Sequence, residues 1–214
     1  MSTYKYKLTY FNFNARAEVI RLIFAAAGVQ YEDERLAVSP FEQEWAVVNK
    51  SFPFQQLPVL EIEGGVVLAQ SHAIARYLAN EFGFAGKTNL EKAKVDMIAD
   101  ATEELYSPMR VYFHAKYNNA KHLQAAFDDI FVKLPHGMSN LERLLTKNNG
   151  GDGFFVGDSL TWADLKFFGR IGNNIQRLNP EFLKQYPKLN TLCDRVAAIP
   201  RIKEWIEKRP EVQF

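Results

Sequence analysis

The chain has 214 residues, 47% of them hydrophobic and 14% aromatic, which is ample for a packed core in one large or two small domains and excludes a disordered protein. Its 26 basic and 25 acidic residues give a formal net charge of +1, so composition offers no electrostatic case for nucleic acid or an acidic membrane as partner. No stretch approaches the roughly 20 apolar residues of a membrane helix, and no apolar signal region follows Lys5 and Lys7.

The first eighty residues alternate between strand and helix patterns. Residues 6–10 read as a short strand, and residues 16–27 carry apolar side chains at helical spacing that stops at Gly28. A second strand at residues 31–36 and a short irregular or helical segment at residues 40–48 follow. This order predicts a βαβ unit with a right-handed crossover.

A hairpin and a helix complete this part of the chain. Strand patterns at residues 59–62 and 66–68 flank Glu63-Gly64-Gly65, where glycine allows a positive φ. Residues 71–82 then carry apolar side chains at helical spacing. The βαβ-ββα order is that of a thioredoxin-like domain, which we assign to residues 1–82.

Only helical patterns follow, which predicts an all-helical domain at residues 89–214 after a linker at residues 83–88. The expected helices span residues 90–117, 122–148, 161–178, 186–199 and 201–208. The third should begin at Thr161, because Asp164 three places later completes a capping pattern. The fold class is therefore α/β plus all-α.

Cys193 is the single cysteine of the chain, so it cannot form an intramolecular disulfide, and this fits a reducing, cytoplasmic setting. It lies in an amphipathic helical pattern, and we interpret it as a small buried apolar residue rather than a nucleophile. The four histidines show no spacing with acids or cysteine that specifies a metal, and no glycine-rich stretch resembles a phosphate loop. We expect no required metal or nucleotide.

The chain resembles the cytosolic glutathione transferases, and within them most closely the sigma class, which includes the glutathione-dependent prostaglandin D synthase. The resemblance rests on Tyr10, Arg16, Trp45, the Gln56-Leu57-Pro58 stretch and residues 70–78, and it continues through Thr161-Trp162-Ala163-Asp164 to the end of the chain. It implies an enzyme that activates the thiol of glutathione, its co-substrate, for attack on apolar electrophiles, a detoxification activity.

The resemblance implies that Tyr10, at the end of the first strand, donates its O–H to the glutathione sulfur. Tyr4 and Tyr6 are the competing tyrosines, but they precede the strand or lie inside it and would point along it or into the sheet. Arg16 is similar to the arginine that modulates this tyrosine, whereas Asn14 replaces a second basic residue of the family pattern. A first-turn surface arginine is the alternative interpretation of Arg16.

The resemblance also assigns residues to each part of glutathione. Leu57, before a cis Pro58, would pair its backbone with the cysteinyl residue. Gln70 and Ser71 would bind the γ-glutamyl end at a helix N-terminus, although Ser71 as a plain helix cap is compatible with the same pattern. Trp45 and Gln56 are candidates for the glycyl end, where Asn49 replaces a common lysine and Lys50 is a neighbouring substitute.

A homodimer is expected from the same resemblance. Asp100, Glu103 and Glu104 recur on one side of a predicted helix, where related dimers present an acid to the glutathione amine in the neighbouring subunit. Glu104 is the preferred candidate, and a solvated helical face is the alternative.

The electrophile is expected between the domains, against an apolar, adaptable wall. Its candidate residues are Phe11, Phe13, Tyr106, Met109, Arg110 and Phe113. The alternative interpretation of the aromatic residues is that they pack in the core and do not contact the electrophile. Val111 stands where the prostaglandin synthase has a tryptophan.

Four other functions compete with conjugation. The same thiolate would serve isomerisation of prostaglandin H to D or reduction of organic hydroperoxides. A non-enzymatic carrier of apolar ligands is a second class, against which the retained Tyr10, Arg16, Gln70 and Ser71 argue. A thioredoxin-like redox enzyme lacks support because the sequence has no Cys-x-x-Cys pair.

Overall fold

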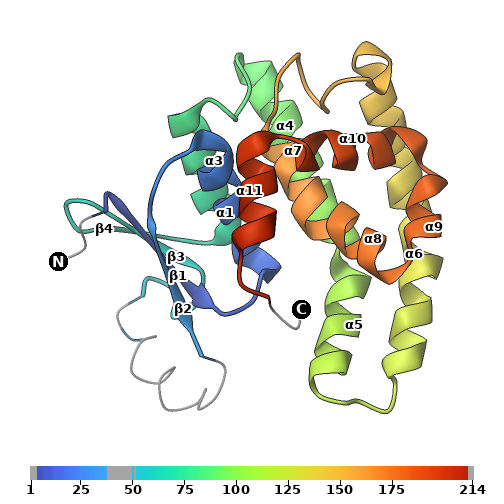
Figure 1. Cartoon of the computed structure of the whole chain (residues 1–214), viewed down its shortest axis with the longest axis horizontal. Coiled ribbons are helices and arrows are strands. Elements are labelled where there is room, and N and C mark those ends of the chain that lie inside the picture. Colours follow the sequence, from blue (N-terminus) through green and yellow to red (C-terminus); the bar gives the residue numbers. More distant parts are fainter. Residues whose placement is uncertain (1–3, 38–49, 51, 212–214) are drawn as a thin grey trace. The chain divides into compact units, whose positions relative to one another are not determined.

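The structure is a computed structural model that describes residues 4–37, 50 and 52–211. The chain divides into two compact units (Figure 1). The first, Met1–Phe82 with Arg201–Phe214, is the α/β unit, and the second, Gly83–Pro200, is the helical unit. This confirms the predicted fold class of a thioredoxin-like part and an all-helical part.

The α/β unit contains a four-stranded sheet in the order β2-β1-β3-β4. Its strands are β1 (Tyr6–Phe11), β2 (Glu32–Leu36), β3 (Val59–Ile62) and β4 (Val66–Ala69). Strand β1 pairs with β2 in parallel and with β3 antiparallel, which is the arrangement that a βαβ unit followed by a hairpin produces. Gly64 and Gly65 turn the hairpin with φ of 91° and 85°, as predicted.

The sheet of the α/β unit is accompanied by helical elements. They are the 3-10 turn η1 (Ala15–Ala17), α1 (Glu18–Ala27), α3 (Ser71–Phe82) and α11 (Pro200–Lys208). Figure 1 shows α1 and α3 side by side against the sheet, and Ile20, Leu22 and Ile74 are fully buried in this core.

Helix α11 is grouped with the α/β unit, although it follows the helical unit in the chain and the sequence places residues 89–214 in the helical domain. The described residues 201–211 group with residues of the α/β unit. The cause is a set of polar contacts that no local pattern reveals. The indole Nε1 of Trp205 and the guanidinium of Arg209 both donate to the buried Glu18 on α1, and Arg201 donates to the carbonyl of Ala27 at 3.0 Å.

The helical unit contains helices where the sequence predicts them, but two are divided. Its elements are α4 (Asn89–Leu105), α5 (Ser107–Tyr117), α6 (Leu123–Lys147), the 3-10 turn η3 (Asn149–Gly151), α7 (Trp162–Phe167), the π-helical turn η4 (Phe168–Gly172), α8 (Asn173–Leu178), α9 (Pro180–Lys184) and α10 (Pro187–Ala197). The predicted helix at residues 90–117 is two helices because Pro108, in the first turn of α5, has no N–H to continue the ladder. The predicted helix at residues 161–178 contains η4 between α7 and α8.

Helix α7 begins where its capping residues predict. The carboxylate of Asp164 accepts hydrogen bonds from the backbone N–H and the hydroxyl of Thr161, at 2.8 and 2.7 Å, and from the backbone N–H of Phe155 at 2.8 Å. Asp164 and Trp162 are both fully buried, so this cap lies inside the core of the helical unit.

Cys193 on α10 is fully buried, which confirms its interpretation as an apolar core residue, and burial raises the pKa of its thiol.

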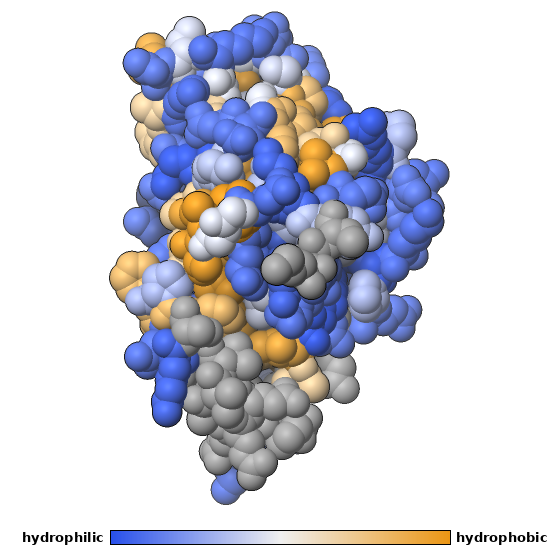
Figure 2. Space-filling model, turned by 90° about the vertical axis from the view of Figure 1, so that its left-hand side faces the viewer, coloured by the Kyte–Doolittle hydropathy of each residue, from blue (hydrophilic) through white to orange (hydrophobic). Residues whose placement is uncertain are grey.

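On the face drawn in Figure 2, apolar side chains gather in patches between hydrophilic ones. Among the described residues, exposed large apolar side chains include Val66 on β4 and Met97, Val111 and Val132 on the helical unit. No helix in the described ranges combines the length and apolar character needed to cross a membrane.

Candidate functional site

The register of the sheet brings three of the predicted residues to one edge. Thr9, Val59 and Ala69 are partners across β1, β3 and β4. Because β3 runs antiparallel to its neighbours, the next positions at this edge are Tyr10, Pro58 and Gln70. We call this edge, with Tyr10, Leu57, Pro58, Gln70 and Ser71, the sheet-edge site.

Tyr10 differs in its surroundings from the competing tyrosines. It is 7% exposed, pairs with Arg35 of β2 near the end of β1, and lies against Phe11 with ring centroids 5.7 Å apart. Tyr6 is 1% exposed and packs against the rings of Phe24 and Phe82 in the core. Its position near the end of β1 therefore favours Tyr10 over Tyr6 as the tyrosine that contacts a ligand.

The loop after Tyr10 is tied to the rest of the α/β unit. The fully buried Arg21 donates from Nη1 to the carbonyl of Phe13 at 2.7 Å and from Nε to Asp33 at 3.1 Å. The backbone N–H of Asn12 donates to Leu36 at 3.0 Å. Arg16, two residues before α1, is exposed in the turn η1 that follows this loop.

Leu57 and Pro58 lie directly before β3, and the bond between them is cis, as the family resemblance implies. Leu57 is 7% exposed and precedes the first residue of the ladder with β1 by two positions. An extended ligand can add to such a position as a short strand.

Gln70 and Ser71 join β4 to α3. Gln70 has a φ of 69°, and its side-chain amide donates to Gln56 Oε1 at 3.3 Å, so two predicted site residues are in contact. Ser71 is the first residue of the 12-residue helix α3. The N-terminus of such a helix favours an anion. Trp45 and Asn49 lie outside the described residues, and Lys50 is exposed.

The three acids predicted on α4 have different surroundings. Glu103 is paired with buried cations of its own unit, Lys166 at 3.0 Å and Arg170 at 3.0 Å. Asp100 and Glu104 are exposed. Glu103 is therefore engaged, which leaves Glu104 as the better of the two adjacent glutamates for an external ligand.

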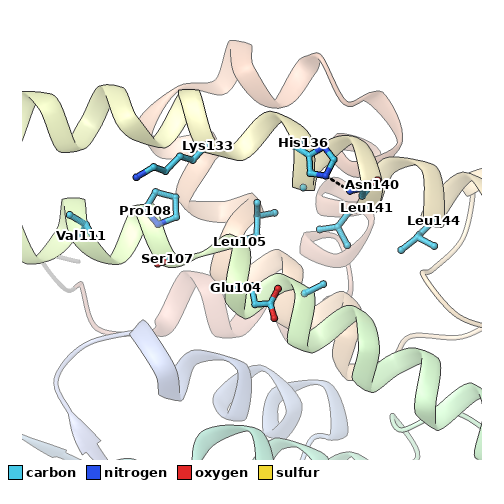
Figure 3. A pocket seen from close by; sticks show the side chains of 12 residues that line it. Glu104, Leu105, Ser107, Pro108, Val111, Lys133, His136, Asn140, Leu141 and Leu144 are labelled. Carbon is cyan, nitrogen blue, oxygen red and sulfur yellow. Dashed lines mark hydrogen bonds between the residues drawn. The ribbon is translucent and has the colours of Figure 1, made fainter.

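Glu104 lies in a pocket of about 550 Å³ between α4, α5 and α6, which we call the α4–α6 groove. In Figure 3, Glu104 projects from α4, and Lys133 and His136 lie on α6 across the pocket. The lining residues are Ala101, Glu104, Leu105, Ser107, Pro108, Val111, Lys133, His136, Gly137, Asn140, Leu141 and Leu144. His136 Nε2 contacts Asn140 at 3.2 Å.

The residues expected to contact the electrophile differ in accessibility. Met109 is fully buried, so the structure assigns it to the core of the helical unit rather than to an open wall. Tyr106 is 7% exposed and stacks with Phe113 at a centroid distance of 6.5 Å, and Arg110 is exposed. Phe11 and Phe13 are half-buried in the α/β unit.

Sequence reasoning missed Lys166 and Arg170. Their side chains are 1% and 4% exposed, and they lie four residues apart in an otherwise apolar stretch of α7 and η4. Two cations at this spacing in a predicted core helix were the available signal. In the parts of the chain that the structure describes, no three His, Cys, Asp or Glu side chains form a metal-binding group.

Comparison with known proteins identifies both halves of the chain. The family model for the glutathione S-transferase N-terminal domain matches residues 6–80, and the model for the glutathione S-transferase C-terminal domain matches residues 103–209.

Individual relatives are similar over nearly their whole length. S-crystallin SL11 from Nototodarus sloanii is 40% identical over 98% of this chain and 98% of its own. The hematopoietic prostaglandin D synthase of Gallus gallus is 39% identical over 96% and 97% of the two chains. The crystal structure of monomeric Na-GST-3, a glutathione S-transferase from the hookworm Necator americanus, has a TM-score of 0.88 and 36% identity over 98% and 99% of the chains.

Proposed function

The chain belongs to the glutathione S-transferase family, and from that premise we propose how its residues activate glutathione. In this proposal Tyr10 donates its phenolic O–H to the glutathione sulfur, and the thiolate then attacks an electrophilic carbon of an apolar substrate. The observation that carries it is the register of the sheet, which brings Tyr10, Pro58 and Gln70 to one edge.

The chemical demand on the site is the deprotonation of a thiol. A cysteine-like thiol has a pKa near about 8.5, and the thiolate is the reactive form. Lowering this pKa by about two units requires roughly 2.7 kcal/mol, which matches a hydrogen bond from Tyr10 to the anion plus the positive potential of Arg16. Catalysis is then mainly supply and orientation of the thiolate.

The rest of the sheet-edge site would hold glutathione in the orientation that this attack needs. The backbone of Leu57, beyond the β3 ladder, pairs with the cysteinyl residue as an added strand would. Gln70, Ser71 and the N-terminus of α3 receive the γ-glutamyl carboxylate. Gln56, which contacts Gln70, is available for the glycyl end together with Trp45.

We further propose a cytoplasmic homodimer in which Glu104 binds the amine of glutathione in the partner subunit. Support comes from the exposure of Glu104 in the α4–α6 groove and from the exposed apolar Val111 in the same groove. One related structure is described as monomeric, so the oligomeric state needs its own measurement. Phe11, Phe13, Tyr106, Arg110 and Phe113 remain the candidates for contact with the electrophile.

The direct test is conjugation of glutathione to chlorodinitrobenzene by the purified protein. We expect turnover above the uncatalysed reaction and a loss of about tenfold or more in Tyr10→Phe, because one donor to the anion is removed. Tyr4→Phe, which changes a tyrosine that is 47% exposed, is the matched control and should retain activity. Glutathione binding without turnover would favour a ligand carrier, and equal activity of all three proteins would remove Tyr10 from the mechanism.

Isomerisation of an endoperoxide is the second candidate function. It is supported by the 39% identity to the hematopoietic prostaglandin D synthase of Gallus gallus. Assays with prostaglandin H and with an organic hydroperoxide, run beside the conjugation assay, distinguish these uses of the same thiolate.

A further inference from the structure

Two arginines of the α/β unit bind the loop that follows β1, and both are attached to the same carboxylate. Arg21 on α1 donates from Nε to Asp33 at 3.1 Å, and Arg35 on β2 donates from Nε to Asp33 at 2.7 Å. Nη1 of Arg21 also donates to the carbonyl of Phe13 in the loop at 2.7 Å. Nη1 of Arg35 donates to Oδ1 of Asn12 in the same loop at 3.2 Å. We call Arg21, Asp33 and Arg35 the Asp33 network.

The two arginines use the same atoms in the same way. A guanidinium is planar and rigid, so a carboxylate that binds its Nε fixes the direction in which its Nη1 donates. Arg21 is fully buried and the side chain of Arg35 is 12% exposed, so water screens these ion pairs less than pairs at the surface. Asp33 therefore orients two donors that bind the loop from two elements, α1 and β2.

The loop joins the two residues that the proposed function assigns to the thiolate. Tyr10 is held in the ladder of β1 with β2, where it pairs with Arg35, whereas Arg16 lies beyond the loop in the turn η1. The place of Arg16 therefore depends on the path of residues 12–15. This path ends in Ala15 with a φ of 29°, and a residue other than glycine keeps a positive φ only where its surroundings hold it there.

We propose that Asp33 is a positioning residue, which holds Arg16 where its charge stabilises the thiolate of glutathione. It acts through the two guanidinium groups and the loop, and not by contact with glutathione. The inference rests on the proposed function, in which Tyr10 and Arg16 stabilise this thiolate. The Asp33 network, the loop and both of these residues belong to the α/β unit.

Asp33→Asn provides the test, because an amide cannot serve both arginines. Its oxygen still accepts from one guanidinium, but its NH2 group meets the other donor without offering an acceptor. The measurement is the pKa of glutathione bound to the protein, followed by the ultraviolet absorption of the thiolate. Glu32→Gln is the matched control, since it removes an acid one position away on β2 whose ion pair, at 3.8 Å, is with Lys7 on β1.

We expect Asp33→Asn to raise the pKa of the bound thiol by about 0.5 unit or more, because the charge of Arg16 is no longer held beside the anion. The direct Coulomb effect has the opposite sign, since removal of a negative charge favours the thiolate and lowers this pKa. The KM for glutathione should stay within about twofold, because the rest of the sheet-edge site lies beside β3 and β4. Glu32→Gln should keep the native pKa of the thiol. An unchanged or lower pKa in Asp33→Asn overturns the proposal, and so does an equal rise in Glu32→Gln.

Arg16→Gln tests the route by which Asp33 acts. This variant should raise the pKa of the bound thiol by itself, and Asp33→Asn added to it should raise the pKa no further, because the two residues act in series. The inference is overturned if Arg16→Gln keeps the native pKa, or if the double variant shows a further rise as large as that of Asp33→Asn alone.

Asn12→Ala decides the question if Asp33→Asn does not fold. It removes an exposed side chain that accepts from Arg35, and it changes no charge. We expect a rise of about 0.3 unit in the pKa of the bound thiol, and an unchanged pKa contradicts the proposal. Equal pKa values in native protein and Tyr10→Phe would overturn the proposed function instead, whereas a rise in Tyr10→Phe with none in Asp33→Asn overturns only this inference.

Discussion

At the scale of single residues, the place of Tyr10 at the end of a strand was accessible to sequence reasoning because it depends on local pattern. Tyr10 is the fifth residue of a strand that ends one position later. Tyr6, at the start of the same strand, packs against the rings of Phe24 and Phe82 in the core. Lys166 and Arg170 carried a local signal in their spacing, but their partner Glu103 could not be identified from it, because Glu103 lies more than sixty positions earlier in the chain.

Lys166 makes the stability of the protein depend on pH. Burial lowers the pKa of Lys166 from 10.5 to about 8, against the opposing effect of Glu103. Below about pH 8 the lysine is protonated in both states, and between about pH 8 and about pH 10.5 only the unfolded chain keeps the proton. The free energy of unfolding therefore rises with pH across this window, by about 3 kcal/mol at most.

Lys166→Met removes this rise, since methionine has no proton to lose. Denaturant unfolding of both proteins at about pH 7.5 and about pH 10 measures the effect. We expect the native protein to gain stability relative to the variant as the pH rises. A difference that stays constant between the two pH values would contradict the assignment of a lowered pKa to Lys166.

At the scale of elements, the turn η4 approaches α10 closely at Gly172. A Cβ added to this glycine would collide with the Sγ of Cys193, while its next neighbours would be at ordinary contact distances of 3.6 and 3.7 Å. We therefore expect Gly172→Ala to destabilise the helical unit by about 1–3 kcal/mol, the usual cost of overpacking. Thermal unfolding of the native protein and of Gly172→Ala measures this loss of stability.

Cys193→Ala provides the rescue, because it removes the one atom that collides. The double variant should recover most of the stability lost in Gly172→Ala, with a coupling energy of about 1 kcal/mol or more. Additive losses in the double variant would show that the collision with Cys193 is not the reason for glycine at this position.

Element positions follow from the sequence where the signal is local. The hairpin around Gly64-Gly65, helix α3 after Gln70 and the cap at Thr161 were all predicted within a residue or two, since each depends on neighbouring residues. The break between α4 and α5 also had a local signal, Pro108, but the apolar pattern continues past it and led to the prediction of one helix at residues 90–117. The place of α11 could not be predicted, because its bonds to Glu18 join residues 187 and 191 positions apart.

At the scale of the whole molecule, the proposed dimer makes glutathione binding depend on Glu104. Glu104→Gln should raise the KM for glutathione about tenfold with little change in kcat, because a charged hydrogen bond to the amine is weakened. Glu181→Gln, at an acid that is 73% exposed on α9, is the control and should leave KM unchanged. Sedimentation of the native protein should show twice the 24.6 kDa chain mass. A monomer with an unchanged KM in Glu104→Gln would contradict this role.

The central claim is that the sheet-edge site stabilises the glutathione thiolate through Tyr10. The measurement that tests it most directly is the pKa of glutathione bound to the protein, followed by the ultraviolet absorption of the thiolate in native protein and Tyr10→Phe. We predict a native pKa about two units below the value of about 8.5 for a free cysteine-like thiol, and a return toward that value in Tyr10→Phe. An equal pKa of the bound thiol in the two proteins would contradict the account.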